Sequence, residues 1–220
     1  MPTALLIGST GLVGKHCLTL LLESGDYDSV TTLSRRKSGL EHPKLIEEIV
    51  DFEKLELYAS RIKADHIFST LGTTIRKAGS QINFHKIDFE YQLETAAIAK
   101  RNGASKHILI SSAGASATSS IFYSREKGLL EEAIGKLNYN TQVVLRPSIL
   151  LGDRSEMRAG EAIGQWAARN LEFLFAGPLK KYKGVTAETV AKAMVTLART
   201  EKGKRKFVEN LEIFEVANTN

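Results

Sequence analysis

Short aliphatic and β-branched runs alternate along the chain with longer segments in which apolar residues recur at helical spacing. This alternation is typical of a parallel sheet that has helices packed on both of its faces. We therefore expect an α/β fold built on a doubly wound parallel sheet. The short runs predict six strands: Ala4–Ile7, Val30–Ser34, Leu45–Val50, His66–Ser69, His107–Ser111 and Thr141–Leu145.

Helical periodicity defines the longer segments between and after these strands. No repeat or low-complexity tract divides the chain, so residues 1–220 are expected to form a single domain. Its core spans about residues 1–150, and about residues 151–220 form a small extension. Within that extension, Phe207–Val216 is either a strand or an extended tail. The predicted helices are Leu12–Ser24, Ser80–Asn102, Phe122–Leu137, Ala159–Leu171 and Ala187–Arg199.

Composition narrows the class of protein. Hydrophobic residues make up 43% and charged residues 25% of the chain, as in ordinary soluble domains. The longest apolar runs are far shorter than the roughly 20 residues that cross a bilayer, and no signal peptide is recognisable. The single cysteine, Cys17, lies in a run typical of the buried side of a helix and cannot form an internal disulfide. We expect a cytoplasmic protein with no membrane association.

The formal charge of +5 raises the question of nucleic-acid binding. The basic residues are scattered among 25 acidic ones and form no patch interleaved with aromatic residues. We therefore interpret them as a solvated surface and expect no nucleic-acid partner. Two local clusters stand out, residues 35–37 and residues 202–206, and only the first lies where a ligand site is expected.

Three glycines lie where the first predicted strand passes into the first helix: Gly8, Gly11 and Gly14, spaced G-x-x-G-x-x-G. A diphosphate must approach the backbone closely in such a turn, and a Cβ atom would obstruct it. The N–H groups that open the helix then donate hydrogen bonds to the phosphate oxygens in a favourable dipole. The turn therefore predicts a dinucleotide-binding Rossmann fold. The expected cofactor contacts here are Gly8, Thr10, Gly11, Leu12 and Val13.

The end of the second strand indicates which dinucleotide is bound. An NAD site commonly has an Asp or Glu about 20 residues after the glycines, which accepts a hydrogen bond from the ribose 2′-hydroxyl. Here the strand ends in Ser34, Arg35 and Arg36, whose donors suit a 2′-phosphate. We expect NADP(H) in preference to NAD(H). The alternative is that these residues form a basic surface loop.

The third strand is followed by Asp51 and Phe52. We expect Asp51 to accept a hydrogen bond from the adenine amino group, with Phe52 packed nearby. The alternative is that Asp51 caps a short helix that starts near Glu53. Both interpretations stay open at this point.

Tyr123 and Lys127 lie four residues apart and therefore on one face of a predicted helix. An ammonium next to a phenol stabilises the phenolate, so such a pair can exchange a proton as a general acid or base near neutral pH. Lys127 is also expected to hold the nicotinamide ribose. The alternative is a pair of exposed helix residues without a catalytic role.

Ser111 and Ser112 end the fifth strand, upstream of that helix. A hydroxyl at this place can polarise a substrate carbonyl. Strand alternation sends the two side chains to opposite faces, so one faces the cofactor and the other faces the packing layer. We assign catalysis to Ser112 and a cofactor contact to Ser111, and alternation alone leaves the reverse assignment open.

The sixth strand is followed by a turn in which the backbone from Pro147 to Ile149 is expected to line the nicotinamide. Asp153 and Arg154 fit a structural ion pair better than a catalytic role. The five histidines have no metal-ligand spacing, so we expect no metal site. The sequence also lacks the glycine that would close a hydrolase nucleophile elbow at Thr118.

These residues together resemble a known family, the Tat-interacting-protein-like branch of the atypical short-chain dehydrogenases. The similarity runs from the glycines to about Val195, and its most specific part is the L-G-T-T-x-x-K-A-G stretch of Leu71–Gly79. The resemblance implies an NADP(H)-binding Rossmann fold with Ser112, Tyr123 and Lys127 as its catalytic set. Further matches are Val50–Leu55, Ser111–Ser112, Lys127–Gly128, Arg146–Pro147, Leu150–Leu151 and Asp153–Arg154.

The Leu71–Gly79 loop follows the fourth strand, where a doubly wound fold places cofactor and substrate contacts. We expect Leu71 and Gly72 to line the cofactor. For Thr73, Thr74 and Lys77, a hydrogen-bonded turn is favoured over contact with a substrate or phosphate.

The leading hypothesis is an NADP(H)-dependent oxidoreductase that passes hydride between the nicotinamide and a carbonyl carbon of a small-molecule substrate. About 65 residues follow Arg154, so the substrate pocket is expected to be small or completed by a partner subunit, in a monomer or a homodimer. One alternative is an NADP(H)-binding regulatory protein with a protein partner. The other is an epimerase or dehydratase that acts on a nucleotide sugar.

Overall fold

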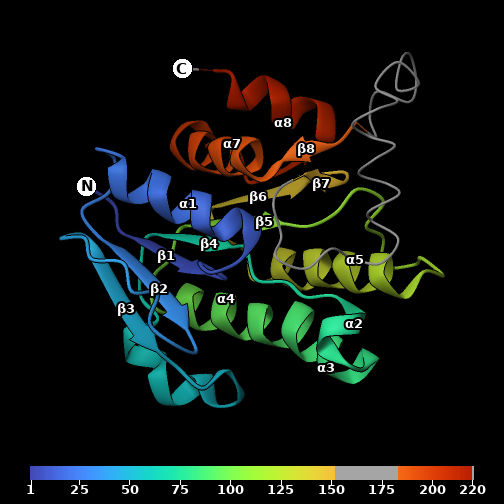
Figure 1. The fold of residues 1–220 in the computed structure, drawn as a ribbon, viewed down its shortest axis with the longest axis horizontal. Helices are drawn as coiled ribbons and strands as arrows, with labels where there is room; N and C mark the ends of the chain where they lie inside the picture. The colour runs from blue at the N-terminus through green and yellow to red at the C-terminus, as the bar shows by residue number, and fades with distance from the viewer. Residues whose placement is uncertain (152–182, 220) are drawn as a thin grey trace.

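The computed structural model describes residues 1–151 and 183–219 and contains a seven-stranded parallel sheet (Figure 1). The strand order is β3-β2-β1-β4-β5-β6-β9, and every neighbouring pair is parallel. The direction of winding reverses between β1 and β4, which confirms the predicted doubly wound α/β fold. The strands are β1 Ala4–Ile7, β2 Val30–Ser34, β3 Leu45–Ile49, β4 His66–Ser69, β5 Lys106–Ile110, β6 Thr141–Arg146 and β9 Arg205–Glu209.

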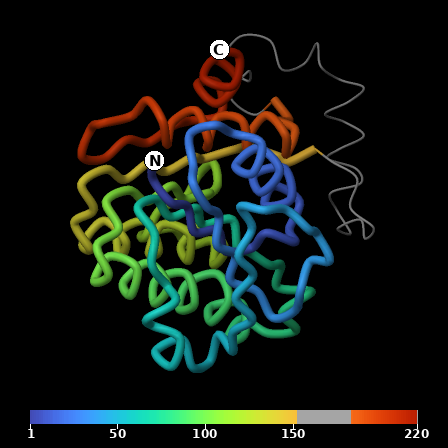
Figure 2. The backbone as a smooth tube through the Cα atoms, turned by 90° about the vertical axis from the view of Figure 1, so that its left-hand side faces the viewer, coloured from blue at the N-terminus to red at the C-terminus, as the bar shows by residue number. Residues whose placement is uncertain are grey.

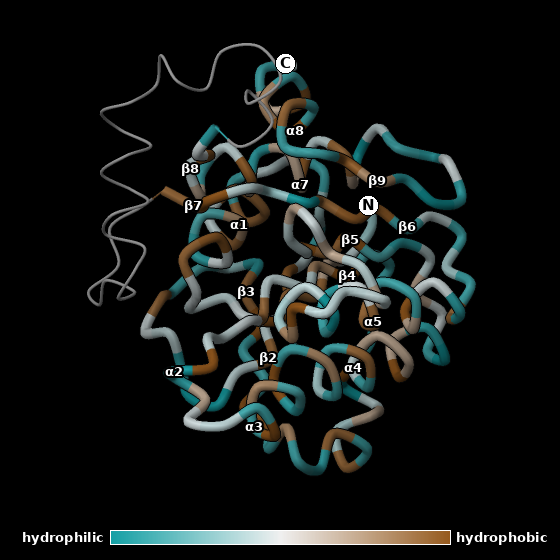
Figure 3. Tube along the Cα trace, turned by 90° about the vertical axis from the view of Figure 1, so that its right-hand side faces the viewer, coloured by the Kyte–Doolittle hydropathy of each residue, from teal (hydrophilic) through white to brown (hydrophobic). Residues whose placement is uncertain are grey.

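Helices cover both faces of the sheet, with the C-terminal helices and η1 on opposite sides (Figures 1 and 2). One face packs against α1 (Leu12–Glu23), α7 (Ala187–Thr200) and α8 (Asn210–Ala217). The other packs against η1 (Phe52–Arg61), α4 (Tyr91–Arg101) and α5 (Phe122–Gly135). Hydrophilic and hydrophobic residues alternate along these helices, as amphipathic helices on a sheet require (Figure 3). None of the helices in the described ranges is long and apolar enough to span a membrane.

Alternation along the strands divides the hydrophobic core into two layers. On β1, Ala4 and Leu6 belong to the layer beneath α1 and α7, whereas Leu5 and Ile7 belong to the layer beneath α4 and α5. All four side chains are buried. Parallel strands that are covered on both faces appear in a sequence as short runs rich in aliphatic, aromatic and β-branched residues, which is why the bounds of β1, β2 and β4 were predictable.

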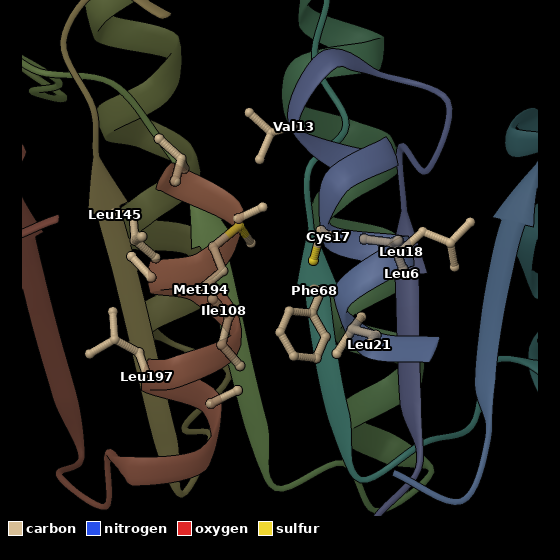
Figure 4. Packing of buried hydrophobic residues seen from close by; sticks show 14 of the residues in the cluster. Leu6, Val13, Cys17, Leu18, Leu21, Phe68, Ile108, Leu145, Met194 and Leu197 are labelled. Carbon is tan, nitrogen blue, oxygen red and sulfur yellow. The ribbon is translucent and has the colours of Figure 1, made fainter. Parts of the chain in front are cut away.

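Cys17, Phe68 and Met194 lie in the layer between α1, α7 and the sheet (Figure 4). All three are fully buried, and burying an apolar side chain of this size stabilises a fold by about 1.5–3 kcal/mol. Burial also raises the pKa of the Cys17 thiol. This cysteine is therefore an unreactive packing residue, which agrees with its predicted place on the buried side of a helix.

The predicted helix Ser80–Asn102 consists of three consecutive segments. These are α3 (Gln81–His85), the π-helical turn η2 (Lys86–Glu90) and α4. Ser80 caps the first of them, because its hydroxyl oxygen accepts the N–H of Asn83 at 3.1 Å. A π-helical turn inside a longer helix often marks a functional site.

The C-terminal segment differs from the prediction. Phe207–Val216 was expected to be a strand or an extended tail, whereas β9 is followed directly by α8. The strand adds a seventh member to the six predicted ones. It lies at the edge of the sheet and has only Val208 buried, so its apolar pattern was too weak to define it.

A second, two-stranded sheet joins β7 (Leu150–Leu151) to β8 (Val185–Thr186) in parallel. This sheet pairs the last residues of the first described range with residues near the start of the second described range. The predicted helix Ala159–Leu171 lies outside the described residues. Thr186 caps α7 as expected, since its hydroxyl oxygen accepts the N–H of Thr189 at 3.1 Å.

Candidate functional site

The turn between β1 and α1 lies at the carboxyl end of the first strand, next to the point where the strand order reverses. Gly8 has φ +82°, a conformation that side chains rarely adopt. A Cβ atom on Gly8 would lie 2.5 Å from the backbone nitrogen of Leu71, and one on Gly14 would overlap the Gly8 carbonyl. The turn therefore admits only glycine at these two positions, because neighbouring protein backbone lies directly against them.

The start of α1 leaves its first N–H groups available to a ligand. Gly11 occupies the N-cap position and provides no side-chain cap, and the first N–H groups of any helix lack partners within it. Thr10 and Gly11 are exposed. Val13 is buried in the core, so only its backbone is available to a cofactor, whereas Leu12 is half-buried and packs against the core.

The predicted phosphate-selecting residues follow β2. Arg35 and Arg36 are exposed at the carboxyl end of this strand, with no carboxylate among residues 34–37. The Ser34 hydroxyl donates a hydrogen bond to the carbonyl oxygen of Arg36 at 2.6 Å. In this geometry Ser34 shapes the arginine loop, and a hydrogen bond from it to a 2′-phosphate would require the hydroxyl to rotate.

Asp51 and Phe52 follow the edge strand β3. Asp51 caps η1, because its Oδ1 atom accepts the N–H of Glu53 at 3.0 Å. Phe52 is buried and its ring lies 5.4 Å from that of Tyr91, measured between centroids. The capping interpretation of Asp51 is therefore the one that the structure displays, and Phe52 packs in the interior rather than at the surface.

The Leu71–Gly79 loop follows β4 and turns into the short helix α2 (Ile75–Ala78). Thr74 caps this helix by accepting the N–H of Lys77 at 3.1 Å, which agrees with the turn predicted for this stretch. Leu71 packs against the core, whereas Gly72 is exposed. A Cβ atom on Gly72 would lie 3.9 Å from the Nζ atom of Lys127, so the loop and the predicted catalytic lysine are neighbours.

Tyr123 and Lys127 lie on the first turns of α5. The Lys127 Nζ atom is 5.9 Å from the centroid of the Tyr123 ring, and that ring packs beside Phe84 at 5.9 Å between centroids. Lys127 is buried and Tyr123 half-buried. The pair is therefore not two exposed helix residues, and it is placed beside the Gly72 backbone.

The two serines at the end of β5 differ in their surroundings. Ser111 is buried and its Oγ atom has no hydrogen-bond partner among the described residues. Ser112 is half-buried, and its hydroxyl lies 3.4 Å from the carbonyl oxygen of Ala113, a weak contact. Neither hydroxyl has a strong hydrogen bond among the described residues, and the choice between them remains a prediction.

The turn after β6 lies beside these serines. The backbone N–H of Ala113 donates a hydrogen bond to the carbonyl oxygen of Pro147 at 2.9 Å. The backbone N–H of Ser111 donates one to the carbonyl oxygen of Leu145 at 2.8 Å. Pro147 is buried and Ile149 is exposed. The two strand ends thus form one continuous wall. Asp153 and Arg154 lie outside the described residues.

Asp88 is the residue that sequence reasoning missed. Its carboxylate is buried, and its Oδ1 atom accepts a hydrogen bond from the Lys127 ammonium at 2.7 Å. Its Oδ2 atom accepts the backbone N–H of Thr73, also at 2.7 Å. Phe84, Asp88 and Gln92 follow at steps of four and all three are buried in the structure. Two of the three are polar, so no apolar pattern in the sequence marked Asp88 as a buried residue.

His107 lies on β5, four residues before Ser111, and is fully buried. Burial lowers its pKa to about 3, so the ring is neutral at physiological pH. Its Nε2 atom is 3.0 Å from the Ser69 hydroxyl on β4. This histidine holds two strands together, which agrees with the core role predicted for some of the histidines. Within residues 1–151 and 183–219, no group of three or more His, Cys, Asp or Glu side chains could hold a metal ion.

Comparison with known proteins gives a family and a set of relatives. A model described as the NAD dependent epimerase/dehydratase family matches residues 4–208. The chain is 34% identical over 216 residues to Protein HTATIP2 of Rattus norvegicus, covering 96% of this chain and 87% of the relative. It is 37% identical over 171 residues to the protein FMP52, mitochondrial, of Candida albicans, covering 73% and 75%. These similarities confirm the resemblance inferred from the Leu71–Gly79 stretch.

Solved structures share the fold at low sequence identity. One is a Thermus thermophilus UDP-glucose 4-epimerase in complex with NAD, with a TM-score of 0.70, 17% identity, and coverage of 98% of this chain and 81% of that one. Another is the Bordetella bronchiseptica enzyme WbmH in complex with NAD⁺, with a TM-score of 0.70, 16% identity, and coverage of 95% and 75%. Likeness at this level concerns the fold alone.

Proposed function

This chain belongs to the NAD dependent epimerase/dehydratase family, and on that premise we propose that it is an NADP(H)-dependent oxidoreductase acting on a small carbonyl or alcohol. One observation carries the proposal. The Lys127 ammonium is buried beside both the Tyr123 ring and the Gly72 backbone, at the carboxyl edge where the glycine turn lies. A proton-transfer pair is therefore adjacent to a cofactor cradle.

The described residues fit a dinucleotide. The turn at Gly8 excludes a side chain, because a Cβ atom there would meet the backbone of Leu71, and the buried Ser111 hydroxyl at the same edge lacks a protein partner among the described residues. Gly8, Gly11 and the opening N–H groups of α1 would hold the diphosphate. Leu71, Gly72, Pro147 and Ile149 would line the nicotinamide end. When bound, the nicotinamide supplies or takes up a hydride.

The preference for NADP(H) is supported by the end of β2. Arg35 and Arg36 are exposed there, and guanidinium groups bind a phosphate through charge-assisted hydrogen bonds. No carboxylate stands among residues 34–37 to accept a ribose 2′-hydroxyl. The Ser34 hydrogen bond to Arg36 keeps this loop in place.

The chain's own residues provide the proton chemistry. Reduction of a carbonyl requires a proton at oxygen in addition to the hydride at carbon, and Tyr123 is proposed to donate it from its hydroxyl. Lys127 stabilises the phenolate that remains, because an ammonium near a phenolate lowers its free energy. Ser112 donates a hydrogen bond that orients the substrate oxygen. In the oxidation direction, Tyr123 accepts the proton instead.

Cofactor titration followed by a substrate screen tests this proposal. NADPH and NADH are titrated separately by fluorescence, and aldehydes, ketones and alcohols are then screened by NADPH absorbance. We expect NADPH to bind at least about tenfold more tightly than NADH, since a 2′-phosphate adds charge-assisted hydrogen bonds. Tighter binding of NADH would contradict the assignment of Arg35 and Arg36. Binding without any turnover is the result expected of a regulatory protein.

A second candidate is chemistry on a nucleotide sugar, favoured by the description of the matched family as epimerases and dehydratases. Incubation with NAD and UDP-glucose, with products separated by chromatography, tests it. Conversion of the sugar without net NADPH consumption would support this candidate over the first.

The proposal includes a cytoplasmic location, a small-molecule substrate, and a monomer or homodimer that binds no nucleic acid. Relatives from fungi carry the word mitochondrial in their names, so fractionation of cells is the appropriate test of location. Light scattering of the purified chain measures the oligomeric state.

A further inference from the structure

Asp88 uses its two carboxylate oxygens for two different parts of the site. Oδ1 accepts the Lys127 ammonium at 2.7 Å, and Oδ2 accepts the backbone N–H of Thr73 at 2.7 Å. The aspartate is 1% exposed and the Lys127 side chain 6%. The lysine of α5 and the loop after β4 therefore meet at one buried group.

A carboxylate is the side chain that suits this place. An asparagine of the same shape has a single acceptor oxygen and an NH₂ group, so it could satisfy either Lys127 or Thr73 but not both. Its NH₂ group would then face a second donor. An ammonium as deeply buried as that of Lys127 is also costly unless a partner of opposite charge compensates it.

The backbone around Asp88 is built to hold it in place. The residue lies in the π-helical turn η2, and its carbonyl oxygen accepts the side-chain amide of Gln92 at 2.9 Å. Gly72 packs directly over the pair, since a Cβ atom there would lie 3.4 Å from Asp88 Oδ1. The loop backbone, the carboxylate and the ammonium thus form one contiguous unit.

We infer that Asp88 is a positioning residue that couples the Leu71–Gly79 loop to the Tyr123–Lys127 pair. This inference rests on the proposed function for the roles of Lys127 and Gly72 toward a cofactor. A ligand contact that moves Gly72 or Thr73 would shift the Asp88 carboxylate and with it the Lys127 ammonium. In the other direction, displacement of the Lys127 ammonium would weaken the hydrogen bond between Asp88 and the Thr73 backbone. Asp88 itself is not assigned a contact with the cofactor or substrate.

Hydrogen exchange of the protein without cofactor tests the coupling directly. The variant Lys127→Met keeps an unbranched stem of similar length and removes the ammonium, while Lys127→Arg restores a cation. We expect Lys127→Met to speed amide exchange in peptides covering residues 71–75 by roughly fivefold, because the carboxylate without its cation holds Thr73 less firmly. Lys127→Arg is expected to keep most of the protection.

Asp88→Asn is expected to speed exchange of the same peptides, and Asp65→Asn is the matched control. Asp65 also accepts a backbone N–H at 2.7 Å, that of Thr3, but lies at the other end of β4. Asp65→Asn should leave the amide exchange of residues 71–75 unchanged. Faster exchange in Asp88→Asn but not in Lys127→Met would overturn the coupling, as would unchanged exchange in both. If Asp88→Asn does not fold, the two Lys127 variants still decide the question.

NADPH affinity provides a second measurement. Asp88→Asn and Lys127→Met are each expected to weaken NADPH binding, and the double variant should lose little more than Lys127→Met alone. Fully additive losses would show that Asp88 acts independently of Lys127. A wild-type protein that binds no NADPH would contradict the proposed function, while the exchange experiment would still confirm or overturn the coupling.

Discussion

The Nζ atom of Lys127 lies 5.9 Å from the centroid of the Tyr123 ring, one helical turn away on α5. The ring is also fixed by Phe84, so the phenol is held by packing on one side and faces a cation on the other. The ring of Tyr123 packs against Phe84, whereas its hydroxyl is the proposed proton donor, so a substitution can remove the hydroxyl and keep the packing. This arrangement therefore permits a specific test of the proposed mechanism.

Tyr123→Phe is expected to abolish most turnover of a substrate found in the screen. Phenylalanine retains the packing against Phe84 but has no proton to transfer, and loss of a general acid typically lowers kcat by about a hundredfold to ten-thousandfold. NADPH affinity should change by less than about twofold. Tyr58→Phe, in η1 and outside the site, is the control and should leave kcat unaltered. Unchanged turnover in Tyr123→Phe would falsify the mechanism.

Gly8→Ala is expected to damage both folding and cofactor binding. The positive φ costs about 1–2 kcal/mol for a side chain, and the new Cβ would also press on the backbone of Leu71 at 2.5 Å. Gly103→Ala is the matched control, since Gly103 also has a positive φ, +99°, but has open space where the Cβ atom would lie. Urea unfolding should show the larger loss for Gly8→Ala, and only this variant should weaken NADPH binding, by tenfold or more. Equal effects of both variants on NADPH would count against the cradle.

The double variant Arg35→Ala/Arg36→Ala is expected to raise the Kd for NADPH by roughly tenfold to a hundredfold and to leave NADH binding unaltered. Charge-assisted hydrogen bonds are worth about 1.5–3 kcal/mol, and only NADPH carries the 2′-phosphate that receives them. Lys202→Ala/Lys204→Ala removes the same charge from exposed residues near the C-terminus and serves as the control. Similar losses for the two cofactors would show that the arginines do not select the 2′-phosphate.

The free energy of unfolding is expected to decrease as the pH is lowered, because His107 is buried in its neutral form. Burial lowers its pKa from 6.5 to about 3. The unfolded chain therefore binds a proton below about pH 6.5, while the folded chain does not until about pH 3. The free energy of unfolding should decline across this window, and at pH 5 this residue accounts for a loss of roughly 2 kcal/mol.

Urea unfolding at pH 7.5, 6 and 5, compared between wild type and His107→Gln, measures this contribution. The variant should be less stable at pH 7.5, because the contact with Ser69 is altered, but its stability should decline less on acidification. His16→Gln changes an exposed histidine and should retain the wild-type slope. A wild-type slope in His107→Gln would show that the histidine is protonated in the folded state.

The cofactor half of the fold was predictable because its signals are local. Strands buried on both faces are short runs rich in aliphatic, aromatic and β-branched residues, and the bounds of β1, β2 and β4 were predicted to the residue. The glycine turn follows the first of these runs. At Asp51, by contrast, two interpretations were open, and the structure displays the N-cap, which needs only an N–H two residues away.

The rest depended on tertiary contacts. Asp88 and Lys127 are 39 residues apart, and nothing near either of them specifies the other. The π-helical turn that holds Asp88 is likewise invisible in a helical repeat of apolar residues. Strand β9 was left open between a strand and an extended tail, because an edge strand with one buried side chain lacks the apolar run by which the other strands were identified.

The small β7–β8 sheet holds two points of the chain that are far apart in the sequence beside each other. Leu150 pairs with Val185 and Leu151 with Thr186, so the two ends of the intervening segment lie at adjacent positions. The length of the intervening segment then has little influence on core folding, since doubling the length of a closed loop costs only about 0.6 kcal/mol. We therefore expect the strands on both sides of this pairing to tolerate changes in the length of the chain between Leu151 and Val185.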